Sequence, residues 1–129
     1  MQANELLERR VLARTTELSQ ANQHLEHEIA ERRLAEEQLR RQALHDALTG
    51  LPNRLLLYDR LEQGVLKCSR SARPLGLLFM DLNGFKEIND TFGHQCGDEL
   101  LRQVGSRLAS RLRSTDTVAR LGGDEFAIL

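Results

Sequence analysis

No glycine or proline occurs between Met1 and His45, and this stretch constrains the fold more than any other part of the chain. It is rich in Leu, Ala, Glu, Gln and Arg, all of which favour helix. The sequence therefore predicts one long helix over residues 1–45. At about 1.5 Å per residue, such a helix would extend roughly 65 Å.

The apolar residues of this helix form a narrow stripe with heptad spacing, which consists of Leu18, Leu25, Ile29, Leu39 and Ala43. Polar residues occupy the other positions of the stripe, namely Asn22, Arg32 and Glu36. This pattern is typical of a coiled-coil seam in which polar residues fix the register. We expect residues 1–45 to form a parallel homodimer, and a solvated helix without a partner is the alternative.

The breakers Gly50 and Pro52 end the long helix, and Asn53 predicts the cap of a second helix that runs to about Ser71. The apolar run over residues 75–80 then predicts a short strand that is buried on both faces. Asp81 follows this strand directly. Acids at the ends of buried strands often hold metals or ligands, and a simple turn or cap acid is the alternative.

The segment that follows predicts a short helix over residues 87–92 and a loop over residues 93–98. Asp98 is expected to cap a longer helix over residues 99–113. A strand over residues 116–121 then leads to Gly122 and Gly123.

Gly122 and Gly123 lie between two short apolar runs, which predicts a tight hairpin turn. Asp124 and Glu125 follow, and in a strand neighbouring side chains point to opposite faces. A bare backbone beside acids suits the close approach of a nucleotide and a hard cation. A solvated hairpin tip is the alternative for this stretch alone.

The composition excludes several classes of protein. Lys and Arg number 18 against 19 Asp and Glu, so the chain lacks the basic surplus of a nucleic-acid-binding protein. Cys68 and Cys96 have no metal-ligand spacing, and we interpret them as reduced thiols of a cytoplasmic protein. No apolar run approaches the length of a membrane span, so we expect no membrane contact within this chain, and a membrane anchor would belong to another part of a parent protein.

Four motifs occur in order along the second part of the chain: residues 46–54, residues 81–94, Gly97-Asp98, and residues 122–126. Together they resemble the GGDEF family of diguanylate cyclases. The resemblance covers residues 46–129 and implies an α/β domain, similar to nucleotidyl cyclases, with a mainly antiparallel sheet. Residues 1–45 resemble the signalling helices that join upstream sensor modules to such domains.

The resemblance implies an enzyme that condenses two GTP molecules to cyclic di-GMP and two pyrophosphates in a dimer. It implies two Mg²⁺ ions per active site, with Mn²⁺ as a substitute, held by Asp81, the Leu82 carbonyl and Asp124. Asp81, Asp124 and Glu125 would be the catalytic acids.

The same resemblance assigns the residues that would bind the substrate. Phe85 and Lys86 match the loop that holds the β- and γ-phosphates. Asn89 and Asp98 match the residues that recognise guanine, because an amide and a carboxylate satisfy its donor and acceptor edge. Gly122 and Gly123 would let the nucleotide approach the backbone.

Arg113 and Asp116 resemble the inhibitory Arg-x-x-Asp motif of the family, which implies that the product cyclic di-GMP binds there and inhibits the enzyme. An arginine can stack on guanine and bind phosphate, while an aspartate accepts from the base edge. The alternative is an arginine at a helix end followed by a turn aspartate.

Two departures from the family pattern affect these expectations. Asn83 stands where many members have aspartate, which removes a charge near the metals but no primary ligand. Family domains also continue beyond the Gly-Gly motif with strands and a helix that contact the triphosphate, so we expect the N-terminal part of such a domain. Two other functions remain open: a GTP- or cyclic di-GMP-binding module without turnover, and a coiled-coil dimeriser with an incomplete passenger domain.

Overall fold

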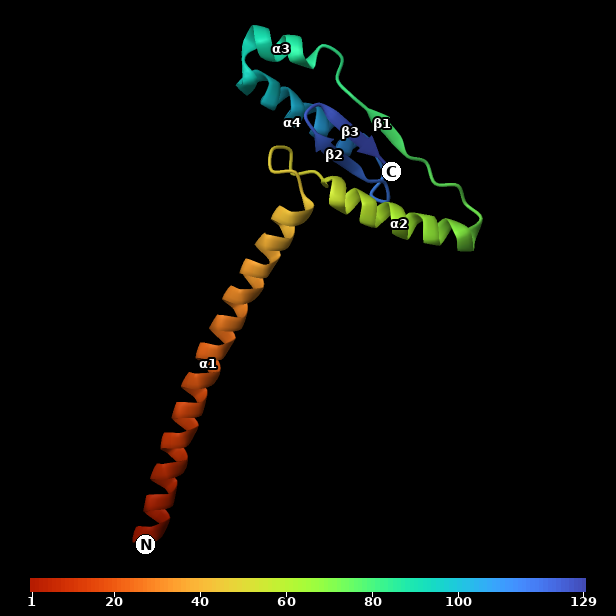
Figure 1. Ribbon diagram of the computed structural model, residues 1–129. Coiled ribbons are helices and arrows are strands. Elements are labelled where there is room, and N and C mark those ends of the chain that lie inside the picture. The colour runs from red at the N-terminus through yellow and green to blue at the C-terminus, as the bar shows by residue number, and fades with distance from the viewer. The chain divides into compact units, whose positions relative to one another are not determined.

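The chain forms two compact units, Met1–Arg40 and Arg41–Leu129, and the computed structural model describes all residues from 1 to 129 (Figure 1). In chain order the elements are α1 (Gln2–Leu44), α2 (Arg54–Ser71), β1 (Leu78–Met80), α3 (Phe85–Phe92), α4 (His94–Arg111), β2 (Val118–Gly122) and β3 (Glu125–Ile128).

α1 confirms the long helix that the sequence predicts, and none of its residues is buried. Ion pairs one turn apart stabilise its surface, such as Arg32 Nε with Glu36 Oε1 at 2.9 Å. The apolar stripe is uncovered in the single chain, where Leu18 is 63% and Ile29 50% exposed. Neither α1 nor any other helix has the sustained apolar character that crossing a membrane requires.

A turn joins the end of α1 to α2. His45 forms an isolated antiparallel bridge with Pro52, which closes the turn. Asn53 caps α2 as predicted, because its side-chain oxygen accepts a hydrogen bond from the Leu56 amide at 3.1 Å. α2 ends at Ser71, and the residue that caps it, Ala72, adopts a left-handed φ of 53°.

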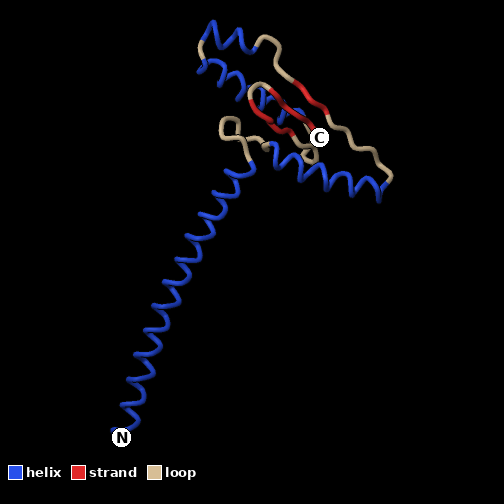
Figure 2. Tube along the Cα trace, viewed as in Figure 1, coloured by secondary structure: helices blue, strands red, loops and turns tan.

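Three antiparallel strands form the sheet in the order β1-β3-β2, so the predicted antiparallel sheet is confirmed (Figure 2). The central strand β3 pairs Phe126 with Met80 on one side and Arg120 on the other. Its next residue, Ala127, pairs with Ala119 of β2. Because paired side chains share a face and neighbours alternate, Ala119 and Ala127 face one side of the sheet.

α2 supplies the main cover of that face. Leu57 of α2 is buried together with Ala119 and Ala127, and Leu77, Leu121 and Leu129 pack around this cluster. α4 also contacts β2, and its Leu101 is 2% exposed. The core is therefore small and lies between the sheet and the helices that flank it.

The prediction that residues 75–80 form a strand buried on both faces is wrong. β1 contains only Leu78–Met80, and Leu78 and Phe79 are 58% and 68% exposed. β1 pairs only with β3 and is an edge of the sheet, and no helix packs closely against it. An apolar run indicates a tendency to be buried, but it does not say which part of the molecule supplies the cover.

The predicted loop over residues 93–98 is also wrong, because α4 begins at His94 and Asp98 lies inside it instead of capping it. The chain breaks earlier, at Gly93, where φ is +85°. Gly97 is buried, and a Cβ at this position would overlap Asn89 Oδ1 and lie 3.2 Å from Phe85 Cζ. Gly97 therefore allows α3 and α4 to pack closely and does not mark a loop.

Candidate active site

The hairpin of β2 and β3 exposes the backbone of its two glycines. Gly122 pairs with Glu125, so Gly123 and Asp124 form the turn, and the ladder is irregular between Arg120 and Gly122. The φ angles of Gly122 and Gly123 are +139° and +51°, and no atom lies within 4 Å of a Cβ added at either position. The hairpin turn is therefore confirmed, and the space beside it is open to a ligand.

Beside the hairpin lies a cavity of about 450 Å³ that two carboxylates share. Met80 of β1 pairs with Phe126 of β3. Asp81, which follows Met80, and Glu125, which precedes Phe126, both line this cavity. Most of the remaining wall is apolar and consists of Leu57, Leu61, Leu77, Phe79, Met80, Leu121 and Phe126. Both carboxylates belong to exposed residues, so they are accessible from this cavity.

Two residues of α2 line the same cavity although the sequence did not identify them as site residues. Arg54 and Tyr58 lie on this cavity and on a second one of about 410 Å³, which Gly122 also lines. Arg54 and Tyr58 are four residues apart and therefore lie on one face of α2. This spacing is the sequence signal that could have identified them. Arg54 forms no ion pair, which leaves its guanidinium available to an anion.

Asp124 lies in the turn, where it is half-buried, and it does not line the cavity that Asp81 and Glu125 share. No three His, Cys, Asp or Glu side chains lie close enough together to hold a metal. Mg²⁺, however, is usually held by one or two carboxylates together with substrate phosphates and water. Asp81, Asp124 and the Leu82 carbonyl each offer an oxygen donor of the type that Mg²⁺ prefers.

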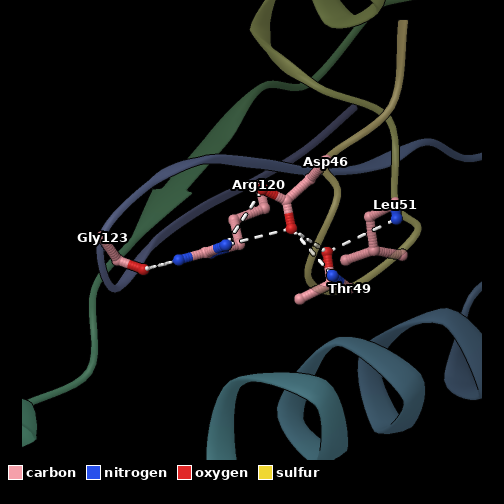
Figure 3. A network of polar contacts seen from close by, with 5 residues as sticks. All are labelled: Asp46, Thr49, Leu51, Arg120 and Gly123. Atoms are coloured by element: carbon pink, nitrogen blue, oxygen red, sulfur yellow. Dashed lines mark hydrogen bonds and ion pairs between the residues drawn. The ribbon is translucent and has the colours of Figure 1, made fainter. Parts of the chain in front are cut away.

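An ion pair connects the hairpin to the turn after α1 (Figure 3). Arg120 Nη1 lies 2.9 Å and 3.0 Å from the two carboxylate oxygens of Asp46. Arg120 Nε and Nη2 donate to the Gly123 carbonyl at 3.1 Å and 2.7 Å. Asp46 begins the first of the four sequence motifs, but its contact with Arg120 was not predicted, because nothing in the spacing pairs the two residues.

The Asp46 carboxylate is held by more than the arginine. The hydroxyl and the backbone amide of Thr49 donate to Asp46 Oδ2 at 2.7 Å and 2.8 Å. Burial raises the pKa of Asp46, but the hydrogen bonds from Thr49 and then those from Arg120, with its positive charge, together lower it below the usual value. Asp46 is therefore charged at neutral pH, and the conformation of the Gly123 backbone depends on it through Arg120.

The residues expected to recognise guanine lie where α3 meets α4. Asn89 Oδ1 is buried and has no hydrogen-bond partner. Asp98 is half-buried and directly follows Gly97, whose Cα packs against the Asn89 amide. An amide oxygen without a hydrogen-bond partner suits a ligand that presents N–H donors.

The residues expected to bind phosphates lie in the first turn of α3. Gly84 precedes this helix with a φ of +76°, and α3 begins at Phe85, which is half-buried. Lys86 is exposed and forms no ion pair. The Phe85 amide donates to the Leu82 carbonyl at 3.3 Å, and the next amides of this helix start, together with a lysine without a partner, are suited to an anion.

A turn brings Arg113 and Asp116 together. The Asp116 amide donates to the Arg113 carbonyl at 3.0 Å, and Asp116 Oδ2 accepts from the Arg113 amide at 3.0 Å. The Arg113 side chain is exposed and forms no ion pair. The carboxylate thus fixes the turn, and the guanidinium remains available to a ligand.

Curated proteins similar to this chain include two from Pseudomonas aeruginosa. The chain is 56% identical over 87 residues to the bifunctional diguanylate cyclase/cyclic di-GMP phosphodiesterase MucR, covering 67% of this chain and 13% of MucR. It is 48% identical over 93 residues to the diguanylate cyclase DgcP, covering 72% of this chain and 14% of DgcP. The chain therefore spans only a small part of the length of these relatives.

Among solved structures, the coiled coil and GGDEF domain of DgcB from Caulobacter crescentus in complex with c-di-GMP is similar, with a TM-score of 0.68 and 34% identity. The similarity covers 95% of this chain and 58% of that chain. Residues 43–129 match the family described as diguanylate cyclase, GGDEF domain. The chain therefore belongs to the GGDEF family of diguanylate cyclases.

Proposed function

We propose that this chain provides the catalytic half-site of a diguanylate cyclase, in which two copies each bind one GTP. The 3′-hydroxyl oxygen of each GTP attacks the α-phosphorus of the other, and pyrophosphate leaves each time. Two ester bonds form, two phosphoanhydride bonds break, and the product is cyclic di-GMP. The observation that carries the proposal is the cavity that Asp81 and Glu125 share beside the open Gly122-Gly123 backbone.

The carboxylates of Asp81 and Asp124 and the Leu82 carbonyl would hold Mg²⁺, or Mn²⁺ in its place. When bound, two such ions neutralise the phosphate charge and lower the pKa of the 3′-hydroxyl. Glu125, which lies in the cavity with Asp81, is proposed to act on the hydroxyl that attacks.

The other residues of the chain position the nucleotide. Phe85 and Lys86, at the start of α3, would bind the β- and γ-phosphates. Asn89 and Asp98 would bind guanine, and the unpaired Oδ1 of Asn89 supports this role. The open backbone at Gly122 and Gly123 gives the phosphates room beside the hairpin.

We infer that Arg113 and Asp116 bind the product as a feedback site and that α1 mediates the homodimer. The free Arg113 guanidinium supports the first role, and the uncovered stripe of α1 supports the second. Both roles are supported by the solved coiled coil and GGDEF domain in complex with c-di-GMP, because the similarity to it covers 95% of this chain. In the parent protein, α1 would carry a signal from an upstream sensor, and both free cysteines fit a cytoplasmic setting.

The test is binding of GTP to the chain by calorimetry, with and without Mg²⁺, followed by analysis of the products. We expect Mg²⁺-dependent binding that falls at least tenfold in Asp81→Asn and in Asp124→Asn. Glu62→Gln, an exposed acid of α2 outside both cavities, is the matched control. Equal Mg²⁺ dependence in all variants would refute the site, and tight GTP binding without product would favour the binding module for this polypeptide.

A further inference from the structure

A pocket of about 330 Å³ adjoins the Arg113–Asp116 turn and reaches residues that the family motif does not include. Its lining brings together Arg60 of α2 and His45, which directly follows α1. The rest of the wall includes Leu51, Pro52 and Leu112, which are apolar. The pocket therefore combines a basic rim with apolar walls, as a nucleotide site does.

Arg60 is held in place without being neutralised. Its Nη1 donates to the hydroxyl of Thr117 at 2.9 Å, and Thr117 is 5% exposed. This partner is neutral, and neither Arg60 nor Arg113 forms an ion pair. A guanidinium has five N–H donors in a fixed fork, so Arg60 keeps most of them for a ligand.

The charges around the pocket favour an anion. Asp116 is the only acid on its lining, and this carboxylate already accepts from the Arg113 amide at 3.0 Å. Arg60 and Arg113 contribute two permanent positive charges against that single negative charge. His45 uses its Nδ1 to donate to the Arg41 carbonyl at 3.2 Å, which leaves its other ring nitrogen without a partner.

We infer that Arg60 is a second phosphate-binding arginine of the product site, and that His45 forms the wall of that site beside the end of α1. The inference rests on the proposed function, since the ligand is the cyclic dinucleotide that Arg113 and Asp116 are proposed to bind. A cyclic dinucleotide carries two phosphates, and the two free guanidinium groups match them in charge. The bound product would then contact α2 and the turn before β2 together.

The test compares the affinity for cyclic di-GMP by calorimetry in single variants of the chain. Arg60→Ala removes a charge-assisted contact, and we expect a loss of about tenfold to a hundredfold. Arg60→Lys keeps the positive charge but lacks the planar guanidinium with its fixed donors, so it should retain part of the affinity for cyclic di-GMP that Arg60→Ala loses. Arg70→Ala, an exposed arginine of the same helix outside the pocket, is the matched control and should bind as the unchanged chain does.

Thr117→Val distinguishes a direct role of Arg60 in ligand binding from a structural one. It removes the hydroxyl that accepts the hydrogen bond from Arg60 and leaves the guanidinium present. A smaller loss in Thr117→Val than in Arg60→Ala, with Mg²⁺-dependent GTP binding retained in both, supports the inference. Unchanged affinity in Arg60→Ala, while Arg113→Ala abolishes binding, overturns it and leaves the product site intact. Absence of cyclic di-GMP binding by the unchanged chain would instead overturn both the inference and the proposed product site.

Discussion

Arg120 and Asp46 form an ion pair at 2.9 Å although 74 residues separate them in the sequence. The side chains are only 11% and 19% exposed, so solvent screens the pair weakly. Arg120 also donates to the Gly123 carbonyl, and its backbone amide donates to the Pro52 carbonyl at 3.0 Å. The turn after α1 and the hairpin that bears the acids are therefore one connected structure.

Asp46→Asn should destabilise the domain by about 1.5–3 kcal/mol at neutral pH, because Arg120 loses a charged partner. The folded-state pKa of Asp46 is lowered, so its contribution is complete above the unfolded value of about 3.9 and is lost as pH falls through the folded value. The difference in unfolding free energy between the unchanged chain and Asp46→Asn should therefore be constant near neutrality and shrink below about pH 4. Urea denaturation at several pH values measures it.

Asp59→Asn is the control for that experiment, since Asp59 is exposed on α2 and accepts only from Gln63, at 3.1 Å. It should change stability by less than about 0.5 kcal/mol. A stability difference for Asp46→Asn that persists unchanged to pH 2 would contradict the role of the ion pair.

Gly97→Ala should weaken GTP binding about tenfold, because the added methyl group would displace the Asn89 amide. The helix itself should tolerate alanine, which favours helix more than glycine does. Gly76→Ala is the matched control, as no atom lies within 4 Å of the added Cβ. Calorimetry with GTP measures the effect, and equal affinities in the two variants would remove the support for Asn89 as a guanine ligand.

Gly122→Ala and Gly123→Ala should both destabilise the hairpin, but to different extents. Gly123 has a φ of +51°, in the left-handed region, where alanine costs about 1–2 kcal/mol. Gly122 has a φ of +139°, outside that region, so its replacement should cost more, up to about 3 kcal/mol. Thermal denaturation ranks the two variants, and the opposite order would show that the turn adopts another conformation.

Local patterns predicted the elements whose signals lie within a few neighbouring residues. The helix from the start of the chain, the Asn53 cap and the Gly122-Gly123 hairpin follow from glycine-free composition, capping chemistry and turn chemistry. The prediction that Asp98 caps a helix was wrong because Gly97 was interpreted as a loop residue. Gly97 instead lies inside α4 and makes room for the Asn89 side chain. A packing glycine and a loop glycine have the same sequence signal.

Contacts between distant residues could not be predicted in the same way. The Arg120–Asp46 pair and the Arg60–Thr117 hydrogen bond each join two elements whose relative placement depends on the whole fold. Likewise, Phe79 is apolar but exposed, because β1 lies at the edge of the sheet. Which acids share a cavity depends on strand register, and this became known only from the pairing of Met80 with Phe126.

The last prediction concerns the apolar stripe of α1, where Leu25 and Ile29 are 52% and 50% exposed in the single chain. If α1 associates with a second copy in parallel, these residues face their counterparts at the seam. Leu25→Lys with Ile29→Lys would place like charges there and remove buried apolar surface, so the dimer should weaken at least a hundredfold. Because α1 would tether the two half-sites at an effective concentration up to about millimolar, its dissociation should reduce any turnover most at low protein concentration.

Sedimentation measures the association, and Leu34→Lys, exposed on α1 outside the stripe, is the control that should leave the dimer in place. A monomer before the substitutions, or an undisturbed dimer after them, would contradict dimerisation through this seam.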